Sequence, residues 1–492
     1  MEKIIDIHSH MFNLKYLPVA GILRRYTNKK IPHVIAKGLE WLLLKNTAES
    51  YPLTSSKIIS IYKAPEYNIT VFQFLNNEKF NYKIDDISNF EHDEIVTAIE
   101  QFVIIGDLIS GELSDALDEF EKIDGYFNKV NFYDDEERIK YRASLLKRML
   151  NWIINIEEAI DNYLKWFLFM TNSEEAIYSY ITKRDETNVS LFLHLMMDVD
   201  HFLNDDPEDL IYKSRFDFEK VQINNMQKLN QNHNNLFGFV AFNPARSNTL
   251  EIIKKAINEK GFKGVKFYPP LGYQADDDNN YSNEIEELLS YCEEENIPLF
   301  THCNNEGFEA WPKIHSGYHS NPKYWEAALI KHPKLILCLG HAGGGHGWFS
   351  ENKDTDKLVA DTIYAKDIVD KSEFQKEDWN KSYASLVFKL CVKYDNVFCD
   401  VSYLDEMINS DGSFDIETKE NFTKRLKKLF ESQQKFATRI MYGSDWHMLF
   451  QEGKNNVYLK MYLDFFNQKE LKQYSEAIFH KNACEYLRLN SP

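Results

Sequence analysis

The sequence predicts an α/β fold: a (β/α)8 TIM barrel with a large, mostly helical insertion after its first strand. Eight short apolar runs, each ending in polar residues, have the lengths of buried strands. Helical patterns lie between several of these runs, as expected of a parallel α/β protein. No G-x-G-x-x-G motif follows any run, which disfavours an open dinucleotide-binding sheet. Eight strands alternating with helices favour the closed barrel.

The predicted strands share a short apolar core of four to nine residues. In chain order they are Lys3–Ile7, Val189–Met197, Leu236–Phe242, Gly264–Tyr268, Ile297–Thr301, Leu335–Leu339, Asn396–Val401 and Arg439–Tyr442.

The helices between the strands are read from apolar residues that recur at helical spacing. Leu250–Lys260 has this pattern and is followed by Gly261, a helix stop signal. The other predicted helices are Asn283–Glu295, Lys323–Lys331, Ser382–Tyr394 and a long tail over Asn456–Leu487.

Residues 1–10 and 189–492 are expected to form the barrel, and residues 11–188 the helical insertion. A connection that follows a barrel strand emerges on the face where active sites lie, so the insertion is expected to cap that face. A side domain or an oligomer contact is the alternative. A second long connection, 342–395, leaves strand six on the same face. The helices expected in the insertion are Val34–Lys45, Asp93–Ile109, Leu113–Phe120, Glu136–Ile156 and Glu157–Met170.

Composition restricts the classes of partner. The 492 residues contain 57 Lys plus Arg against 76 Asp plus Glu, a net charge of −19, which disfavours nucleic acids and anionic membranes. No uncharged run reaches the roughly 18 residues of a membrane span. Six scattered cysteines without a C-x-x-C pair indicate reduced, buried thiols. We therefore expect a cytoplasmic protein with a small-molecule substrate, either a monomer or a homo-oligomer.

Metal-ligand residue types fall at the predicted strand ends. His8 and His10 are two residues apart, which places both imidazoles on one face of a strand. His302, His341 and Asp445 end strands five, six and eight, and all these ends meet at one rim of a barrel. Such nitrogen and oxygen ligands suit Zn2+, with Mn2+, Fe2+ or Co2+ as alternatives.

The expected chemistry is hydrolysis. A catalytic ion lowers the pKa of water from 15.7 toward about 7. Asp445 is placed to take a proton from that water and hand it to the leaving group. His341 would polarise a substrate carbonyl or bind a second ion.

Lys266 ends strand four in Gly-Val-Lys-Phe-Tyr. A lysine that points into such a barrel must lower its pKa, form an ion pair or be chemically altered. Three roles stay open: a carboxylated lysine (a carbamate) that bridges two ions, a cation that holds a substrate carboxylate, and a structural ion pair.

This set of motifs resembles the amidohydrolase superfamily, and most closely its amidohydrolase-related metal-dependent hydrolase branch. The residues that carry the resemblance are Asp6–His10, Gly264–Tyr268, Thr301–His302, Gly340–Gly343, Gly443–Asp445 and the tail Lys481–Leu487. The resemblance covers residues 1–10 and 189–492, whereas the insertion 11–188 has no counterpart.

The resemblance implies a site and a function. His8, His10, His302 and Asp445 would be the ligands of a one-metal site, with His341 catalytic. In the two-metal form, a modified Lys266 bridges the ions and the histidines of strands five and six hold the second. The implied activity is hydrolysis of a C–N or C–O bond in an amide, cyclic amide, ester or lactone. Decarboxylation of an aromatic or unsaturated acid is the alternative within the family, and a non-catalytic metal-containing binding protein is the alternative outside it.

Polar and aromatic residues after the strands are candidates for substrate binding, although packing roles compete for each of them. They are Arg246, Tyr268, Tyr273, Asn304, His346, Trp348 and Trp446.

Overall fold

The computed structural model consists of two compact units, residues 1–12 together with 180–492, and residues 13–179. The residues that it describes are 3–26, 166, 169–170, 172–184, 189–199, 217–276, 281–304, 307, 316–349, 379, 382–409 and 411–489.

The first unit contains an eight-stranded parallel sheet in the order β1 to β8, which confirms the predicted barrel. The backbone N–H of Ile7 donates to the carbonyl of Tyr442 at 3.2 Å, and the N–H of Asp445 donates to the carbonyl of His8 at 2.7 Å. These bonds join the segment after β8 to β1 and close the barrel. The strands are β1 (Ile4–Ser9), β2 (Val189–Leu195), β3 (Leu236–Ala241), β4 (Gly264–Phe267), β5 (Leu299–His302), β6 (Leu337–Gly340), β7 (Val397–Asp400) and β8 (Ile440–Met441).

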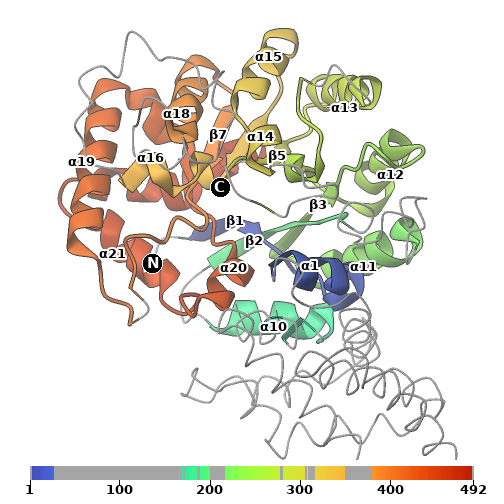
Figure 1. Cartoon of the computed structure of the whole chain (residues 1–492), viewed down its shortest axis with the longest axis horizontal. Coiled ribbons are helices and arrows are strands. Elements are labelled where there is room, and N and C mark those ends of the chain that lie inside the picture. Colours follow the sequence, from blue (N-terminus) through green and yellow to red (C-terminus); the bar gives the residue numbers. More distant parts are fainter. Residues whose placement is uncertain are drawn as a thin grey trace, which may run out of the picture. The chain divides into compact units, whose positions relative to one another are not determined.

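Helices surround these strands, as α12, α13, α15, α18 and α19 show in Figure 1. The helices of this unit among the described residues are α11 (Asn224–Asn232), α12 (Thr249–Lys260), α13 (Ser282–Glu294), α14 (Ser316–His319), α15 (Lys323–Lys331), α16 (Gly345–Phe349), α18 (Tyr383–Lys393), α19 (Ile416–Ser432), α20 (Trp446–Gln451), α21 (Tyr458–Phe466) and α22 (Asn482–Tyr486). The short 3₁₀ and π turns are Phe218–Ile223, Pro269–Leu271, His341–Gly343, Gln434–Thr438, Lys472–Tyr474 and Ala477–Lys481.

The four predicted helices between strands are all present, and local signals set their ends. Gly261 follows α12 in the left-handed conformation, with φ 78°. The side chain of Ser382 accepts a hydrogen bond from the N–H of Ser385 and so caps α18.

The predicted helical tail over Asn456–Leu487 is divided in the structure, because α21 ends at Phe466 and the chain continues in short turns before α22. The polar run Asn467–Glu470 supplies no apolar side chain that could hold a continuous helix against the barrel.

The tail closes the amino-terminal end of the barrel. The ring of Tyr486 in α22 is fully buried, and its hydroxyl donates to the carbonyl of Leu299, the first residue of β5, at 3.0 Å. The ring centroids of Phe239 and Phe398 lie 6.2 and 5.6 Å from that of Tyr486. With this end filled by apolar side chains, the carboxyl ends of the strands hold the polar residues.

In the second unit, the structure describes a 3₁₀ helix (Leu14–Tyr16), α1 (Val19–Tyr26) and the beginning of α10 (Glu174–Arg184). The hydroxyl of Tyr16 donates to a carboxylate oxygen of Glu174 at 2.6 Å. The helices predicted for 34–45, 93–109, 113–120 and 136–156, and most of 157–170, lie outside the described residues, so the helical insertion and its capping role stay predictions. No helix within the described part of the chain is long and apolar enough to cross a membrane.

Candidate metal centre

A bulge in β1 turns the first histidine toward the barrel interior. Asp6 pairs with Phe192 of β2 and Ser9 pairs with His194, so β1 has one extra residue between these two pairs and the register shifts by one. Ile7 and His8 both lie in this irregular segment. Ile7 belongs to the apolar core, and the ring of His8 lies 4.8 Å from the ring of Phe300, a core residue of β5. Consecutive residues of β1 therefore both contact the interior.

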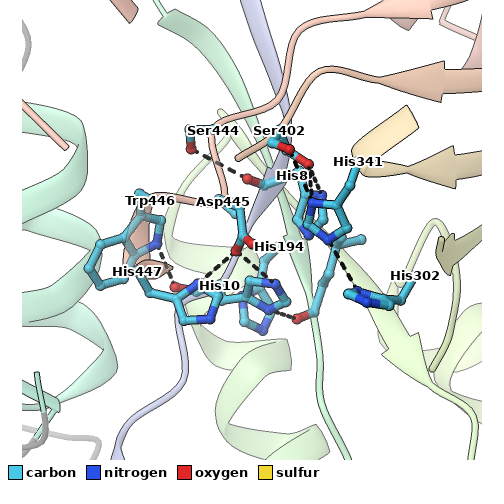
Figure 2. Close-up of polar contacts among 12 residues, drawn as sticks. His8, His10, His194, His302, His341, Ser402, Ser444, Asp445, Trp446 and His447 are labelled. Atoms are coloured by element: carbon cyan, nitrogen blue, oxygen red, sulfur yellow. Dashed lines mark hydrogen bonds and ion pairs between the residues drawn. The ribbon is translucent and has the colours of Figure 1, made fainter. Parts of the chain in front are cut away.

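His10, Asp445 and His447 form one group of ligand atoms (Figure 2). Nε2 of His10 lies 3.5 Å from Oδ1 of Asp445, and Nδ1 of His447 lies 2.8 Å from the same oxygen. Nδ1 of His10 lies 2.7 Å from the carbonyl of Leu195. Because a carbonyl only accepts, Nδ1 carries the proton and the Nε2 lone pair of neutral His10 is free to bind an ion.

His302 and His341 form the second group, and their rings point toward each other in Figure 2. Nδ1 of His302 lies 3.1 Å from Nε2 of His341. The ring of His8 joins the two groups, since its centroid lies 5.3 Å from that of His10 and 4.7 Å from that of His341. The strand ends thus bring together the residues predicted as ligands.

These residues fit a metal ion. Two ligand atoms that lie about 2.1 Å from one tetrahedral ion are about 3.4 Å apart, close to the 3.5 Å and 3.1 Å separations in the two groups. Oδ1 of Asp445 is buried and faces the imidazole nitrogens of His10 and His447. Two sets of three side chains place one ligand atom each within 4.8 Å of the others: His8 with His10 and Asp445, and His8 with His341 and Asp400.

Burial and the neighbouring histidines lower the pKa of His10 and of His341, which favours the neutral form that metal binding requires. Burial lowers the pKa of His341 to about 4, and nearby His8 contributes to the shift. Burial also places the pKa of His10 well below its ordinary value, with His447 as the next cause. For Asp445, burial opposes ionisation, but His447 and His8 outweigh it and hold the pKa of this carboxyl well below its usual range.

Lys266 is buried in the same interior, where its Nζ lies 4.5 Å from the ring centroid of Phe300 and 5.9 Å from that of Tyr268. Its ammonium group forms no hydrogen bond and no ion pair with the residues that the structure describes. Burial lowers the pKa of Lys266 to about 8, although Asp445 and Asp400 oppose the shift.

The structure places two of the predicted substrate contacts beside the histidines. The ring of Tyr268 lies 5.1 Å from the ring of His302 and retains 8% exposure. Asn304 follows His302 by two residues and is partly exposed. Both stay predictions as substrate contacts.

Other predicted substrate contacts have partners elsewhere in the barrel. Arg246 forms a two-pronged ion pair with buried Asp198, in which Nη2 donates to Oδ1 at 2.8 Å. The hydroxyl of Tyr273 donates to the carbonyl of Phe242 at 3.0 Å, and its ring is fully buried.

The two predicted tryptophans are also buried. The indole N–H of Trp348 donates to the carbonyl of Ala342 at 2.9 Å, and its ring lies among Trp379, Phe422 and Phe436. The indole N–H of Trp446 donates to the carbonyl of His10 at 2.8 Å, which ties the start of α20 to the end of β1. The side chain of His346 lies outside the described part of the structure.

Sequence reasoning missed the contribution of β7. Asp400 ends this strand and contacts the imidazole of His8 and the backbone N–H of His341. Ser402 follows it, and its hydroxyl contacts the imidazoles of both histidines. The Asp-x-Ser spacing repeats the two-residue spacing of His8 and His10, which is the signal that could have found the pair.

The amidohydrolase family model matches residues 224–364 of this chain. That stretch contains Lys266, His302 and His341, whereas His8, His10 and Asp445 lie outside it. The match confirms the resemblance to the amidohydrolase superfamily over this part of the barrel and supports an enzyme of the hydrolase class. No curated protein sequence matches the chain.

Several solved structures are similar to this chain at low identity. An uncharacterised TIM-barrel protein from Bordetella bronchiseptica is 12% identical, with 64% of this chain and 82% of that chain covered and a TM-score of 0.39. An amidohydrolase from Burkholderia multivorans with bound zinc is 9% identical, with 66% of this chain and 92% of that chain covered and a TM-score of 0.38. A dihydroorotase from Campylobacter jejuni is 13% identical, with 64% of this chain and 80% of that chain covered and a TM-score of 0.33.

Proposed function

We propose that this protein is a metal-dependent hydrolase of the amidohydrolase superfamily that cleaves a C–N or C–O bond in a small metabolite. The observation that carries the proposal is the convergence of His8, His10, His302, His341 and Asp445, from four different strands, on one end of the barrel. Zn2+ is the ion that we propose, because imidazole nitrogens and one carboxylate suit it best.

His8, His10, His302 and Asp445 would hold the ion, and His341 lies within reach of a second. When bound, such an ion supplies Lewis-acid chemistry: it polarises a substrate carbonyl and lowers the pKa of water. The match of the amidohydrolase family model to residues 224–364 is sequence evidence that supports the proposal.

The chain's own residues would move the proton. The carboxylate of Asp445 is ionised and buried, and its Oδ1 faces the histidine cluster, so it can accept a proton from water and deliver it to the leaving nitrogen or oxygen. His10 presents an unprotonated Nε2 because Leu195 fixes its tautomer. Tyr268 at the edge of the cluster would contact the substrate beside His302.

Lys266 would act in one of two ways. Without a carboxylate partner among the described residues, its amine is free either to become a carbamate or to pair with an anionic group of the substrate. A pKa of about 8 leaves a substantial neutral fraction near neutral pH, and carbamate formation needs the neutral amine.

The test combines metal content with one substitution. We expect the purified protein to retain one or two Zn2+ ions per chain, and Asp445→Asn to lower turnover of amides, cyclic amides, esters or lactones by about 10²–10⁴-fold. Asp405→Asn is the matched control, because Asp405 is also buried but pairs with Lys454. A protein that binds no divalent ion after loading, or a fully active Asp445→Asn enzyme, would refute the proposal. Release of CO2 from aromatic acids without hydrolysis would instead assign the decarboxylase alternative.

A further inference from the structure

Asp400 is a fully buried carboxylate at the end of β7 with hydrogen-bond donors around both of its oxygens. Oδ2 lies 2.9 Å from Nδ1 of His8. Oδ1 accepts from the backbone N–H of His341 at 2.6 Å, from the hydroxyl of Ser402 at 2.8 Å and from the N–H of Ser402 at 3.3 Å. The carboxylate therefore contacts two candidate ligands on two different strands.

These contacts determine which nitrogen of His8 carries the proton. An ionised carboxylate only accepts, so Nδ1 of His8 must donate and Nε2 keeps its lone pair. The hydroxyl of Ser402 gives its proton to Asp400, and its oxygen lies 2.7 Å from the same Nδ1 of His8.

The same pair of residues orients His341. Nδ1 of His341 lies 3.1 Å from the carbonyl of Ser402 and 3.0 Å from its hydroxyl oxygen. Nδ1 therefore faces β7, and Nε2 faces Nδ1 of His302. The bond from the His341 N–H to Asp400 also holds the left-handed backbone of His341, with φ 61°.

We propose that Asp400 and Ser402 are positioning residues that fix the Nδ1-protonated tautomer and the ring orientation of His8 and His341, so that both Nε2 atoms are available to a metal ion. The inference rests on the metal site proposed above. Carboxylates that hold ligating imidazoles in this way raise metal affinity by about 10- to 100-fold.

Asp400 is better suited to this role than to binding the ion itself, although its oxygen lies near His8 and His341. Both of its oxygens already accept hydrogen bonds, including two from backbone N–H groups, whereas the contacts of Oδ1 of Asp445 are with the imidazole nitrogens of His10 and His447. The segment after β8 also packs against the pair: a Cβ added at Gly443 would lie 3.0 Å from Oδ2 of Asp400.

Asp400→Asn tests the inference because one of the two carboxylate oxygens, which only accept, is replaced by an NH2 group, which only donates. If its oxygen accepts from the two backbone N–H groups, its NH2 faces His8 and forces the proton of His8 onto Nε2. We expect Zn2+ affinity, measured by competition with a chelator, to fall by about 10- to 100-fold. Ser402→Ala should lower the affinity less, because each ring keeps another acceptor. Asp405→Asn, the buried carboxylate that pairs with Lys454, should leave it unchanged.

A second measurement needs no metal. Nitrogen NMR of the ¹⁵N-histidine-labelled apo-protein, with His8 assigned through His8→Gln, should show the proton on Nδ1 in the wild type and on Nε2 in Asp400→Asn. Wild-type affinity in Asp400→Asn would overturn the inference and leave the proposed function intact. An Nε2-protonated His8 in the wild type would also overturn it, even if Asp400→Asn fails to fold. A wild type that binds no Zn2+ but shows the expected tautomer would reject the proposed function alone.

Discussion

Replacing His194 with asparagine should remove about 2 kcal/mol of the stability that this protein loses between pH 7 and pH 5. His194 lies in β2, is fully buried, and accepts a hydrogen bond at Nδ1 from the N–H of Met11 at 2.6 Å. Its Nε2 has no hydrogen-bond partner within the described structure. Burial lowers the pKa of His194 to about 3, because a proton on Nδ1 would break the bond to Met11 and place an uncompensated charge in the interior.

The sign follows from the two pKa values. The unfolded chain binds a proton at His194 near pH 6.5, and the folded chain near pH 3. Between these values the unfolded state holds more protons, so the free energy of unfolding rises with pH and falls as the solution is acidified. Above pH 6.5 His194 costs the folded state little, because it is neutral in both states. Between pH 7 and pH 5 it lowers the free energy of unfolding by about 2 kcal/mol.

The assay is urea unfolding of the chelator-treated protein at pH 7 and pH 5, for the wild type and for His194→Asn. An asparagine oxygen can still accept from Met11 but does not titrate, so the variant should lose about 2 kcal/mol less than the wild type over this interval. All other titrating groups are common to both proteins and cancel in the comparison. Equal losses in the two proteins would refute a buried, neutral His194.

Substitutions at two positions test the packing at the two ends of the barrel. Gly443→Ala would place a Cβ 2.8 Å from the Cβ of His8 and 3.0 Å from Oδ2 of Asp400, so we expect the free energy of unfolding in urea to fall by about 1–3 kcal/mol and Zn2+ to bind more weakly. A wild-type stability together with a wild-type Zn2+ affinity would contradict the close approach of the segment after β8. Tyr486→Ala should cost about 3–5 kcal/mol through the cavity it leaves, whereas Tyr486→Phe should lose only the bond to Leu299, about 1 kcal/mol; equal effects of the two variants would mean that the ring does not fill the barrel end.

The barrel could be predicted because its strands are buried on both faces and therefore read as continuous apolar runs. Each predicted run overlaps a strand of the structure, with ends displaced by a few residues. The displacement has local causes: Pro298 lacks an N–H, and β5 begins after it, at Leu299. The tail could not be predicted as well, because its polar interruption is short and the periodicity on both sides of it is helical.

The histidines of the site could be predicted because metal ligands at strand ends have a recognisable residue type and position. Asp400 could not, since an aspartate at a strand end is common and its role depends on His8, which lies 392 residues away in the sequence. The pairing of Arg246 with Asp198 was missed for the same reason: each was visible as a polar residue after a strand, but only the fold shows that they pair with each other.

Left-handed backbone conformations gather at the end of the barrel that holds the candidate metal site. His341, Ala342, Tyr403 and Asp445 have φ values between 45° and 61° and lie within four residues of the ends of β6, β7 and β8. Side chains other than glycine rarely adopt this conformation, which costs roughly 1–2 kcal/mol per residue. Two of these residues are held by backbone bonds to the site itself, from His341 to Asp400 at 2.6 Å and from Asp445 to His8 at 2.7 Å. A fold maintains such turns only where surrounding contacts impose them, and here those contacts orient the candidate ligands. The same hydrogen bonds that hold the turns therefore also fix the positions of the imidazoles and of the carboxylate.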